Sequence, residues 1–526
     1  MRTRRLLTDI LASRAESTPD RRAYVFRSED DVEQDTLTYR ELHERALAVA
    51  DELARRCRPG DRALLLFPAG LDFIVSYFGC LYARIIAVPV NRPRRNRVQD
   101  ATLGIIKEAD PAVLLTVSSM RVMLEMTRIN VDSLPSTADF VPRKIDDDEV
   151  AFLQYTSGST AAPKGVCVTH RNLLANQEMI TRAFGHDENS TVVGWAPLFH
   201  DQGLIGNVLN PLYVGSTSVL MSPLVFIRWP LRWLTTISHY RAHTSGGPNF
   251  AYEACLARAA RDGVPDVDLS CWRNAFNGAE PIRAETLRRF ADVFGPAGFH
   301  PEAHFPCYGL AEATLMVSAS GTGRGARTVV SDDGRTLVGS GSVVEGQDVR
   351  IVDPASGNDC APGEIGEIWV AGDNVTRGYW RGEESFVPYL HTGDLGMLVD
   401  GELYVAGRLK DLIIIRGRNF YPQDIERTVE SSHPALQEGA CAAFSVPDAA
   451  GEKLVVAQEL KREYLGEADR SEVRATIRAA VIREHGVSLG DLVLLRPVQL
   501  QKTSSGKIMR SAARNRYLNG ELGGTD

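Results

Sequence analysis

The chain has 526 residues, more than one ordinary domain requires, and 44% hydrophobic with 24% charged residues is typical of a globular protein. Its net charge of −8 and pI near 5.9 argue against binding nucleic acid or an anionic membrane through a general positive field. The apolar stretch at 62–90 is broken by Pro68, Asp72 and Arg84, and the basic N-terminus lacks a long apolar run. We therefore expect neither a membrane span nor a signal peptide. The eight cysteines form no Cys-x-x-Cys pair and no His/Cys cluster, which indicates free thiols and a cytoplasmic protein.

Helical and strand-like patterns alternate from the N-terminus to about residue 320. Apolar residues at helical spacing predict a helix at 38–54, with Thr36 or Thr38 as its cap. The next patterns predict a strand at 62–67, a helix at 70–84 and a strand at 86–90. This alternation predicts α/β layers with a mostly parallel sheet.

The pattern changes beyond residue 328. Short β-rich runs separated by Gly and Pro turns at 328–407 predict a small antiparallel or barrel-like subdomain. A unit of about 115 residues follows, which is a normal domain size. We expect it to contain strands at 411–415, 440–446 and 453–460, helices at 423–431 and 471–485, and a basic tail.

These patterns predict two domains. The first, residues 1–409, is a large domain of layered α/β subdomains that includes the barrel-like subdomain. The second, residues 410–526, is a small and mobile α+β domain. We place the hinge between them at Lys410, where an ordinary surface turn is the alternative.

The most informative motif is the run YTSGSTAAPKGV at 155–166. Its hydroxyls, free backbone N–H groups and lysine can surround phosphate oxygens, and a predicted strand at 150–154 leads into it. It is not a Walker A loop, and a solvated Ser/Thr-rich turn is the alternative. The candidate phosphate ligands are Thr156, Ser157, Gly158, Ser159, Thr160 and Lys164.

This loop resembles the TSGSTGxPKG loop of the adenylate-forming superfamily, which includes acyl-CoA synthetases, peptide-synthetase adenylation domains and firefly-type luciferases. Ala161 stands where most members have Gly. Further short segments resemble the superfamily in the same order, at 197–203, 277–281, 307–314, 392–394, 407–408 and 501–510. Each is weak alone, but their order along nearly the whole chain makes the resemblance specific.

The resemblance implies a nucleotide site. Gly278, Ala279 and Tyr308 would flank the adenine, and Gly309 would also belong to the nucleotide-binding residues. Glu312, with Thr160, would bind Mg²⁺, which prefers hard oxygen ligands. Asp394, supported by Arg408, would accept hydrogen bonds from the ribose hydroxyls. Lys507 would be the catalytic lysine that bridges the substrate carboxylate and the α-phosphate, although by composition alone its segment is a flexible basic tail.

The resemblance also implies an acyl pocket. Trp195, Gly246 and Pro248 would form its wall, and His200 would lie where the acyl group meets the reaction centre. On general grounds, a histidine on such a loop is more often structural.

Several stretches resemble the fatty acyl-AMP ligase branch most closely, at 154–160, 200–203, 245–252, 308–314 and 411–426. Members of that branch use ATP and Mg²⁺ to make acyl-adenylates. They then pass the acyl group to the phosphopantetheine thiol of an acyl carrier protein, generally without using CoA. The chain has no Asp-Ser-Leu phosphopantetheine site, so its carrier would act in trans. The resemblance implies a role in polyketide or lipopeptide biosynthesis, and Arg510, Arg514 and Arg516 are candidates for docking the carrier, with a solvated tail as the alternative.

One departure keeps the acceptor open. Relatives in this branch carry an insertion between a Gly-Tyr-Trp segment and the Thr-Gly-Asp motif, whereas here Trp380 and Thr392 are separated only by residues 381–391. In this branch the insertion is the usual structural reason for refusing CoA. Without it, CoA is the alternative acceptor. An acyl-CoA ligase and an aryl-acid or amino-acid adenylating enzyme are the alternative enzymes. A catalytically inactive nucleotide-binding regulator is disfavoured by Lys164, Glu312, Asp394 and Lys507.

Overall fold

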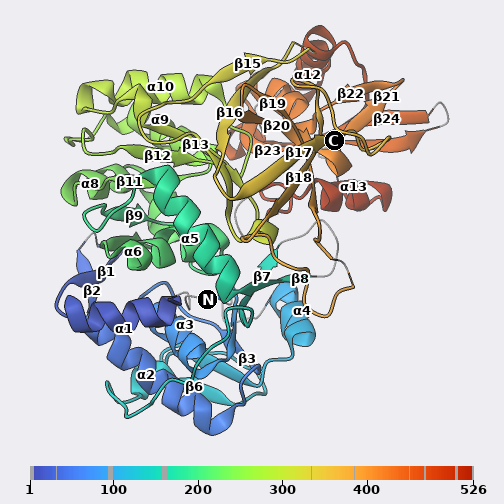
Figure 1. Ribbon diagram of the computed structural model, residues 1–526. Helices are drawn as coiled ribbons and strands as arrows, with labels where there is room; N and C mark the ends of the chain where they lie inside the picture. The colour runs from blue at the N-terminus through green and yellow to red at the C-terminus, as the bar shows by residue number, and fades with distance from the viewer. Residues whose placement is uncertain are drawn as a thin grey trace. The chain divides into compact units, whose positions relative to one another are not determined.

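The computed structural model describes residues 5–30, 32–92, 99–156, 163–332, 334–383, 385–448, 451–466, 469–503 and 507–523 (Figure 1). These residues form two compact units. The large unit runs from the N-terminus to Thr392 and includes Gly396–Ala406. The small unit comprises Gly393–Leu395 and the chain from Gly407 onward. The role of Lys410 as a hinge stays a prediction.

Two sheets organise the described part of the large unit. The six-stranded sheet has the spatial order β6 (Arg128–Asn130), β5 (Val113–Thr116), β3 (Arg62–Leu65), β4 (Ile86–Pro89), β7 (Val150–Thr156) and β8 (Lys164–Thr169). The fourteen-stranded sheet has the order β17 (Gln347–Val352), β18 (Gly366–Gly372), β19 (Leu390–Val399), β20 (Glu402–Arg408), β16 (Thr336–Val343), β14 (Met316–Ala319), β13 (His304–Gly309), β12 (Asn274–Asn277), β11 (Thr244–Gly247), β9 (Val192–Gly194), β10 (Ser218–Met221), β1 (Arg22–Arg27) and β2 (Glu33–Thr38), with β15 (Thr328–Val330) paired to β16.

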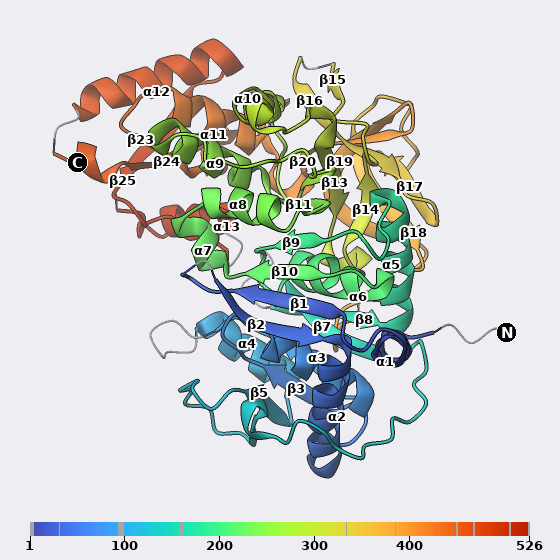
Figure 2. The ribbon, with the colours of Figure 1, turned by 90° about the vertical axis from the view of Figure 1, so that its left-hand side faces the viewer.

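The larger sheet has a parallel part and an antiparallel part, and its edge strand β2 pairs antiparallel with β1. Strands β1, β10, β9, β11, β12 and β13 pair in parallel, and four of the strands at this end, β9, β10, β1 and β2, lie side by side in Figure 2. From β13 to β14 and onward through β16 and β20 the pairing is antiparallel. These pairings confirm the predicted α/β class and the antiparallel strands predicted after residue 328. The antiparallel strands continue the same sheet through β14.

Helices cover these sheets. They are α1 (Leu7–Ser17), α2 (Tyr39–Arg56), α3 (Asp72–Ala83), α4 (Asp100–Ala109), α5 (His170–Phe184), α6 (Asn210–Val214), α7 (Pro223–Arg228), α8 (Leu231–His239), α9 (Asn249–Asp262) and α10 (Ala284–Phe294), with a π-helix η2 (Gln202–Leu209) and the short 3-10 turns η1 (Val131–Ser133), η3 (Gly295–Ala297), η4 (Pro301–Ala303) and η5 (Ala311–Ala313). The Thr38 side chain accepts a hydrogen bond from Glu41 N, and the Glu41 side chain accepts one from Thr38 N. Of the two predicted caps for α2, Thr38 is therefore the correct one.

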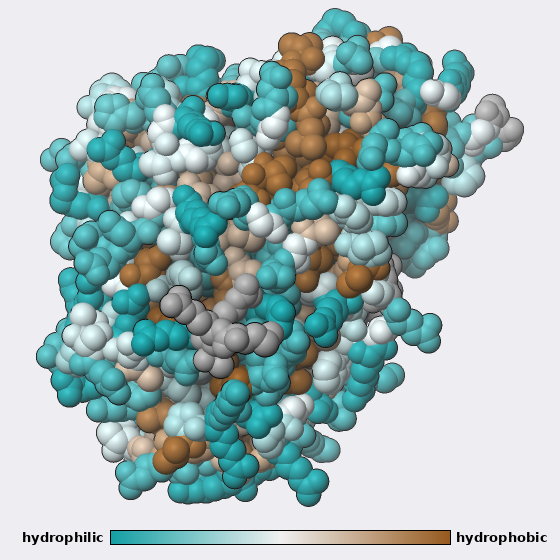
Figure 3. All heavy atoms as spheres, in the orientation of Figure 1, coloured by the Kyte–Doolittle hydropathy of each residue, from teal (hydrophilic) through white to brown (hydrophobic). Residues whose placement is uncertain are grey.

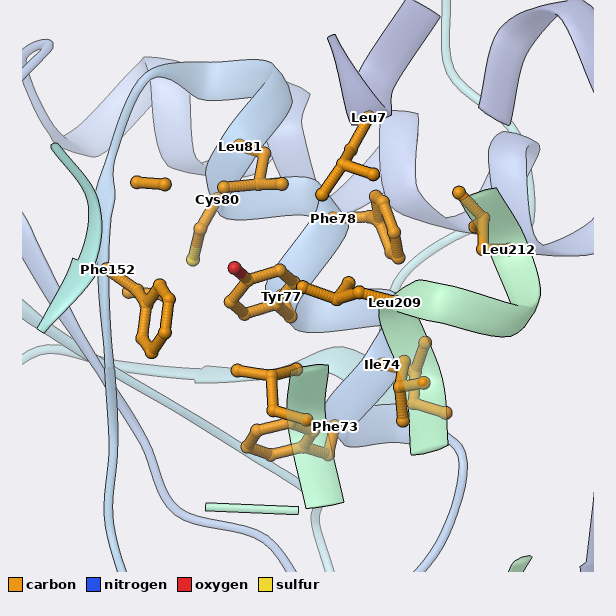
Figure 4. Packing of buried hydrophobic residues seen from close by; sticks show 14 of the residues in the cluster. Leu7, Phe73, Ile74, Tyr77, Phe78, Cys80, Leu81, Phe152, Leu209 and Leu212 are labelled. Carbon is orange, nitrogen blue, oxygen red and sulfur yellow. The ribbon is translucent and has the colours of Figure 1, made fainter. Parts of the chain in front are cut away.

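Helix α3 is buried on every side. All residues from Phe73 to Ala83 are buried, because this helix packs against α1 and α2 as well as against β3 and β4 of the six-stranded sheet. Figure 4 shows its Tyr77 facing Phe152 of β7, with the ring centroids 5.8 Å apart, and Leu209 of η2 beside the helix. Strand β7 leads into the predicted phosphate loop and η2 follows His200. Helix α3 therefore fixes the two parts of the site to one core.

The small unit is an α+β structure. Its elements are η6 (Leu409–Asp411), β21 (Ile413–Ile415), β22 (Arg418–Phe420), α11 (Pro422–Ser431), β23 (Leu436–Asp448), β24 (Gly451–Leu460), η7 (Arg462–Tyr464), α12 (Arg470–His485), β25 (Leu489–Leu495) and α13 (Arg510–Leu518). Strands β23, β24 and β25 form one sheet, and β21 pairs with β22. All five predicted elements of this region are confirmed. The sequence analysis missed β22, β25 and α13.

The C-terminal residues that were expected to be a basic tail form helix α13. Its Ala513 is buried, and the Tyr517 ring lies edge-on to Phe444 of β23 with centroids 5.8 Å apart. Arg514 Nε donates to Ser445 O at 2.9 Å and Arg516 donates to Gln499 O at 2.7 Å. The solvated-tail alternative is therefore wrong for these residues. Their contacts within the small unit also give no support to a carrier-docking patch.

All eight cysteines lie among the described residues and are free. Burial raises the pKa of each thiol, to about 11 for Cys167 and about 12 for Cys307.

Within the described residues, no helix combines the length and the apolar composition that crossing a bilayer requires. In the lower part of Figure 3, around α1, α2 and α4, most exposed side chains are hydrophilic, with a few apolar ones among them. Single exposed apolar residues are normal on a folded surface.

Candidate active site

The predicted phosphate loop joins two paired strands. In the antiparallel pair β7–β8, Thr156 lies opposite Lys164, so the strands enter and leave the loop side by side. A Cβ at Gly165 would lie 2.8 Å from Tyr155 Cζ, which explains why glycine stands at this position. The predicted ligands Ser157, Gly158, Ser159 and Thr160 lie outside the described residues. Thr156 and Lys164 are therefore the two loop ligands whose placement is defined.

Tyr379 brings Lys164 and Glu312 together. The Tyr379 hydroxyl donates a hydrogen bond to Glu312 Oε1 at 2.8 Å, and Lys164 Nζ lies 4.6 Å from the centroid of the Tyr379 ring. The predicted phosphate-binding cation and the predicted metal-binding carboxylate thus share one contact residue. The sequence analysis used the segment that contains Tyr379 only as a landmark, and no local pattern marks it as a contact of either group.

The turn that carries Glu312 is held in a strained conformation. Thr314 has a φ of +67°, which is costly for a β-branched residue, and its hydroxyl donates to Asn374 O at 2.6 Å. Asn374 Nδ2 in turn donates to Ala313 O at 3.0 Å, and Thr376 N donates to Glu312 O at 2.9 Å. Surrounding hydrogen bonds therefore maintain this backbone, as is typical of functional turns.

The predicted adenine segments are adjacent. Strands β12 and β13 pair in parallel, with Asn277 opposite Pro306, and the segments with Gly278 and Tyr308 follow directly. A Cβ at Gly278 would lie 2.7 Å from Cys307 O, so these two segments approach each other as closely as glycine permits. Ala279 has a φ of +66°. At Gly309 a Cβ would lie 1.7 Å from Leu315 O.

The predicted ribose pair is in contact. Asp394 lies in β19 and is 6% exposed, and Arg408 Nε donates to Asp394 Oδ1 at 2.9 Å. Both residues belong to the small unit as the contacts divide the chain. A carboxylate accepts hydrogen bonds from several donors, which suits the two hydroxyls of a vicinal diol.

Lys507 is an exposed residue of the small unit. Its N–H donates to Thr503 Oγ1 at 3.1 Å, its carbonyl accepts from Thr503 N at 2.8 Å, and Lys502 pairs with Ile508. These contacts place Lys507 beside Thr503, shortly before α13. Lys410 lies in η6, and its role, like that of Lys507, stays a prediction.

His200 precedes the π-helix η2. Gln154 Nε2 of β7 donates to Phe199 O at 3.0 Å, which ties the His200 turn to the strand before the phosphate loop. π-Helices are rare and are frequently found at functional sites. The structure thus links the His200 segment to the phosphate-loop strand.

An aromatic cluster surrounds Trp195. The Trp195 ring, 5% exposed, stacks on Phe226 with centroids 4.0 Å apart and planes at 14°. A Cβ at Gly247 would lie 2.4 Å from Trp195 Cζ2, and one at Gly246 would lie 2.1 Å from Phe276 O. Pro248 follows as the cap of α9. The predicted residues Trp195, Gly246 and Pro248 are therefore neighbours, and Gly247 is a contact of Trp195 that the sequence analysis missed. Their role as an acyl-pocket wall stays a prediction.

The fold is that of an adenylate-forming enzyme, and comparison with known proteins shows the family. Residues 11–380 match the family described as "AMP-binding enzyme", and residues 410–525 match "Disco-interacting protein 2-like, AMP domain". The chain therefore belongs to the AMP-binding enzyme family and is a ligase of the fatty acyl-AMP ligase type.

Individual relatives cover nearly the whole chain. The medium-chain-fatty-acid–[acyl-carrier-protein] ligase JamA of Moorena producens (strain JHB) is 42% identical over 98% of this chain and 95% of its own length. The 4-hydroxyphenylalkanoate adenylyltransferase of Mycobacterium tuberculosis is 35% identical over 99% of this chain and 93% of its own. The crystal structure of the fatty acyl-adenylate ligase from L. pneumophila in complex with acyl adenylate and pyrophosphate is 37% identical, covers 98% of this chain and 97% of its own, and has a TM-score of 0.77.

Proposed function

We propose that this enzyme uses ATP to convert a fatty or related carboxylic acid into an acyl-AMP and pyrophosphate, and then transfers the acyl group to the phosphopantetheine thiol of an acyl carrier protein. The observation that carries the proposal is the contact of Tyr379 with both Lys164 and Glu312. It combines a cation beside the phosphate loop with a carboxylate suited to a divalent metal.

In the first step, a carboxylate oxygen of the acid attacks the α-phosphorus of ATP in line. A P–O bond to the acyl group forms, the P–O bond to the β-phosphate breaks, and pyrophosphate leaves with its electron pair. No enzyme nucleophile is needed. Holding two reactants in line can contribute roughly 7–11 kcal/mol toward the barrier, and Lys164 and Lys507 would neutralise the developing charge.

Glu312 fits a magnesium ion. An ionised carboxylate is a hard oxygen donor with about four lone-pair sites, and the Tyr379 hydroxyl occupies one of its two oxygens. Bound Mg²⁺ would supply further charge neutralisation at the phosphates. Thr160, the second proposed ligand, lies outside the described residues.

In the second step, the carrier thiol attacks the acyl carbonyl and releases its proton to solvent, a C–S bond forms, the acyl C–O bond to the phosphate breaks, and AMP leaves with that electron pair. JamA is named as a ligase for an acyl carrier protein, which supports a carrier as acceptor here. Lys410 is the proposed hinge between the two steps. Trp195, His200, Gly246 and Pro248 are the proposed contacts of the acyl group. By extension, we place the reaction in polyketide or lipopeptide biosynthesis.

CoA is the second candidate acceptor. The observation that favours it is the short connection at 381–391, in which Phe386 is 4% exposed and packs edge-on against Tyr379 at 5.1 Å. The segment 381–391 is too short to contain the insertion that similar ligases carry between these two motifs. In those ligases the insertion restrains the small domain.

Mass spectrometry of the products tests both readings. The protein is incubated with Mg·ATP and fatty acids of increasing length, first alone, then with CoA and with a phosphopantetheinylated carrier protein. We expect an acyl-AMP that persists with CoA and is consumed by the carrier. Acyl-CoA formation would establish the second candidate, and the absence of any acyl-AMP would refute the proposed activity.

A further inference from the structure

The segment 373–380 bridges the two halves of the phosphate and metal site. On one side, Cys167 N donates to Gly378 O at 3.2 Å and Trp380 N donates to Gly165 O at 2.7 Å, which joins the segment to β8 beside Lys164. On the other side, Thr376 N donates to Glu312 O at 2.9 Å. Its backbone therefore sets the distance between the strand that carries Lys164 and the turn that carries Glu312.

The same segment is anchored to the core. Asn172 Nδ2 of α5 donates to Asp373 O at 2.8 Å and to Val375 O at 3.1 Å. Asn374 is fully buried and bonds to the turn of Ala313 and Thr314. Because both ends and the middle are held, the side chain of Tyr379 projects from a fixed backbone.

We propose that Tyr379 is a positioning residue of the nucleotide site, which orients the Glu312 carboxylate for the metal and seats the Lys164 ammonium beside the phosphates. This inference rests on the proposed function, in which Glu312 binds Mg²⁺ and Lys164 binds the phosphates.

The chemistry of tyrosine suits both tasks. A neutral hydroxyl donor fixes the direction of the Glu312 carboxylate without cancelling its charge, so the carboxylate keeps its affinity for a cation. An aromatic face attracts an ammonium without neutralising its charge, so Lys164 can keep its contact with the ring while it binds a phosphate. Tyr379 thus preorganises two charged groups and neutralises neither.

The test compares Tyr379→Phe with Tyr379→Leu. The first variant removes the hydroxyl but keeps the ring and its packing on Phe386. The second variant also removes the aromatic ring that the Lys164 ammonium contacts. Tyr389→Phe is the matched control, because Tyr389 donates to the exposed Asp348 carboxylate elsewhere on the large unit. The readouts are calorimetric binding of a non-hydrolysable ATP analogue with and without Mg²⁺, and ATP–pyrophosphate exchange against Mg²⁺ concentration.

For Tyr379→Phe we expect the half-saturating Mg²⁺ concentration to rise about 10- to 100-fold, as for other partners of metal-ligating carboxylates, while metal-free binding of the analogue stays unchanged. For Tyr379→Leu we expect an additional loss of about 2- to 5-fold in metal-free binding. Tyr389→Phe should change neither quantity.

A parallel Glu312→Gln variant separates the two proposals. If Glu312→Gln raises the Mg²⁺ requirement and Tyr379→Phe does not, the positioning role is wrong while the proposed function stands. If Glu312→Gln itself leaves the Mg²⁺ requirement unchanged, Glu312 does not bind Mg²⁺ as the proposed function states. The positioning role of Tyr379 is then wrong as well.

Discussion

At the scale of single residues, Lys507 tests the proposed chemistry most directly. We expect Lys507→Ala to lower acyl-AMP formation by about 10²- to 10³-fold, the loss typical of removing one group that stabilises transition-state charge. Binding of ATP should persist, because Lys164 and the phosphate loop would remain. Exchange kinetics and calorimetry measure the two quantities. Lys453→Ala, another lysine of the small unit, is the control, and acyl-AMP formation at the wild-type rate in Lys507→Ala would contradict the assignment.

Gly247 gives a second prediction at this scale. Because a Cβ there would lie 2.4 Å from Trp195, Gly247→Ala must displace the Trp195 ring from its stack on Phe226. Such overpacking costs typically about 1–3 kcal/mol of unfolding free energy. Denaturant unfolding should show this loss, together with a changed chain-length preference for the acid. Gly295→Ala is the control, since its Cβ would meet nothing within 4 Å. An equal free energy of unfolding in both variants would mean that the Trp195 ring can shift without loss of stability.

At the scale of elements, Arg510 anchors helix α13 to the rest of the small unit. Its Nε and one terminal nitrogen donate to the two Glu426 oxygens at 2.7 Å each, and its other terminal nitrogen donates to Asp411 at 3.2 Å. Burial lowers the pKa of Arg510, but the attraction of Glu426 and Asp411 outweighs it, so the net pKa is raised. This arrangement joins the residues after Lys507 to those after Lys410.

We expect Arg510→Gln to destabilise the small unit by about 3 kcal/mol, because it leaves two partly buried carboxylates without this cation. Hydrogen exchange should accelerate at α13 and at Ala443 of β23, whose N–H also donates to Glu426 at 3.0 Å. Arg483→Gln, which breaks an exposed pair with Glu484, should change stability by less than about 1 kcal/mol. Unchanged protection of α13 in Arg510→Gln would rule out the anchoring role.

The elements that were predicted correctly are those whose helix or strand pattern can be recognised within the segment itself. Helix α2 has a capping residue and a continuous apolar face, and β3 and β4 are short apolar runs. Strand β22 has three residues and was missed for want of a pattern, and α13 was missed because its composition is strongly basic. The contact of Tyr379 with Lys164 and Glu312 joins segments that are distant in the sequence. It follows from tertiary packing, which no local pattern records.

At the scale of the whole molecule, three buried histidines make the large unit sensitive to acid. Burial lowers the pKa of His170, His186 and His304 to about 4, against about 6.5 in the unfolded chain. Between these values the unfolded state binds more protons, so the free energy of unfolding falls as the pH falls. At pH 5 each histidine costs about 2 kcal/mol relative to pH 7.5.

Urea unfolding at pH 7.5, 6 and 5 measures this effect. His304→Gln removes one titrating group while its amide can still donate to Leu287 O, as His304 Nε2 does at 2.9 Å. The variant should lose stability less steeply than the wild type between pH 6.5 and 5. Parallel curves for the two proteins would show that His304 does not contribute.

The eight native thiols have a practical consequence for following catalysis. Maleimide and other electrophilic dyes react with the thiolate, and the raised pKa of every native sulfhydryl leaves less thiolate at neutral pH than an exposed cysteine has. An engineered surface cysteine on each unit should therefore outcompete all of them for a dye. Single-molecule fluorescence between two such labels could then record both half-reactions in an otherwise unaltered protein.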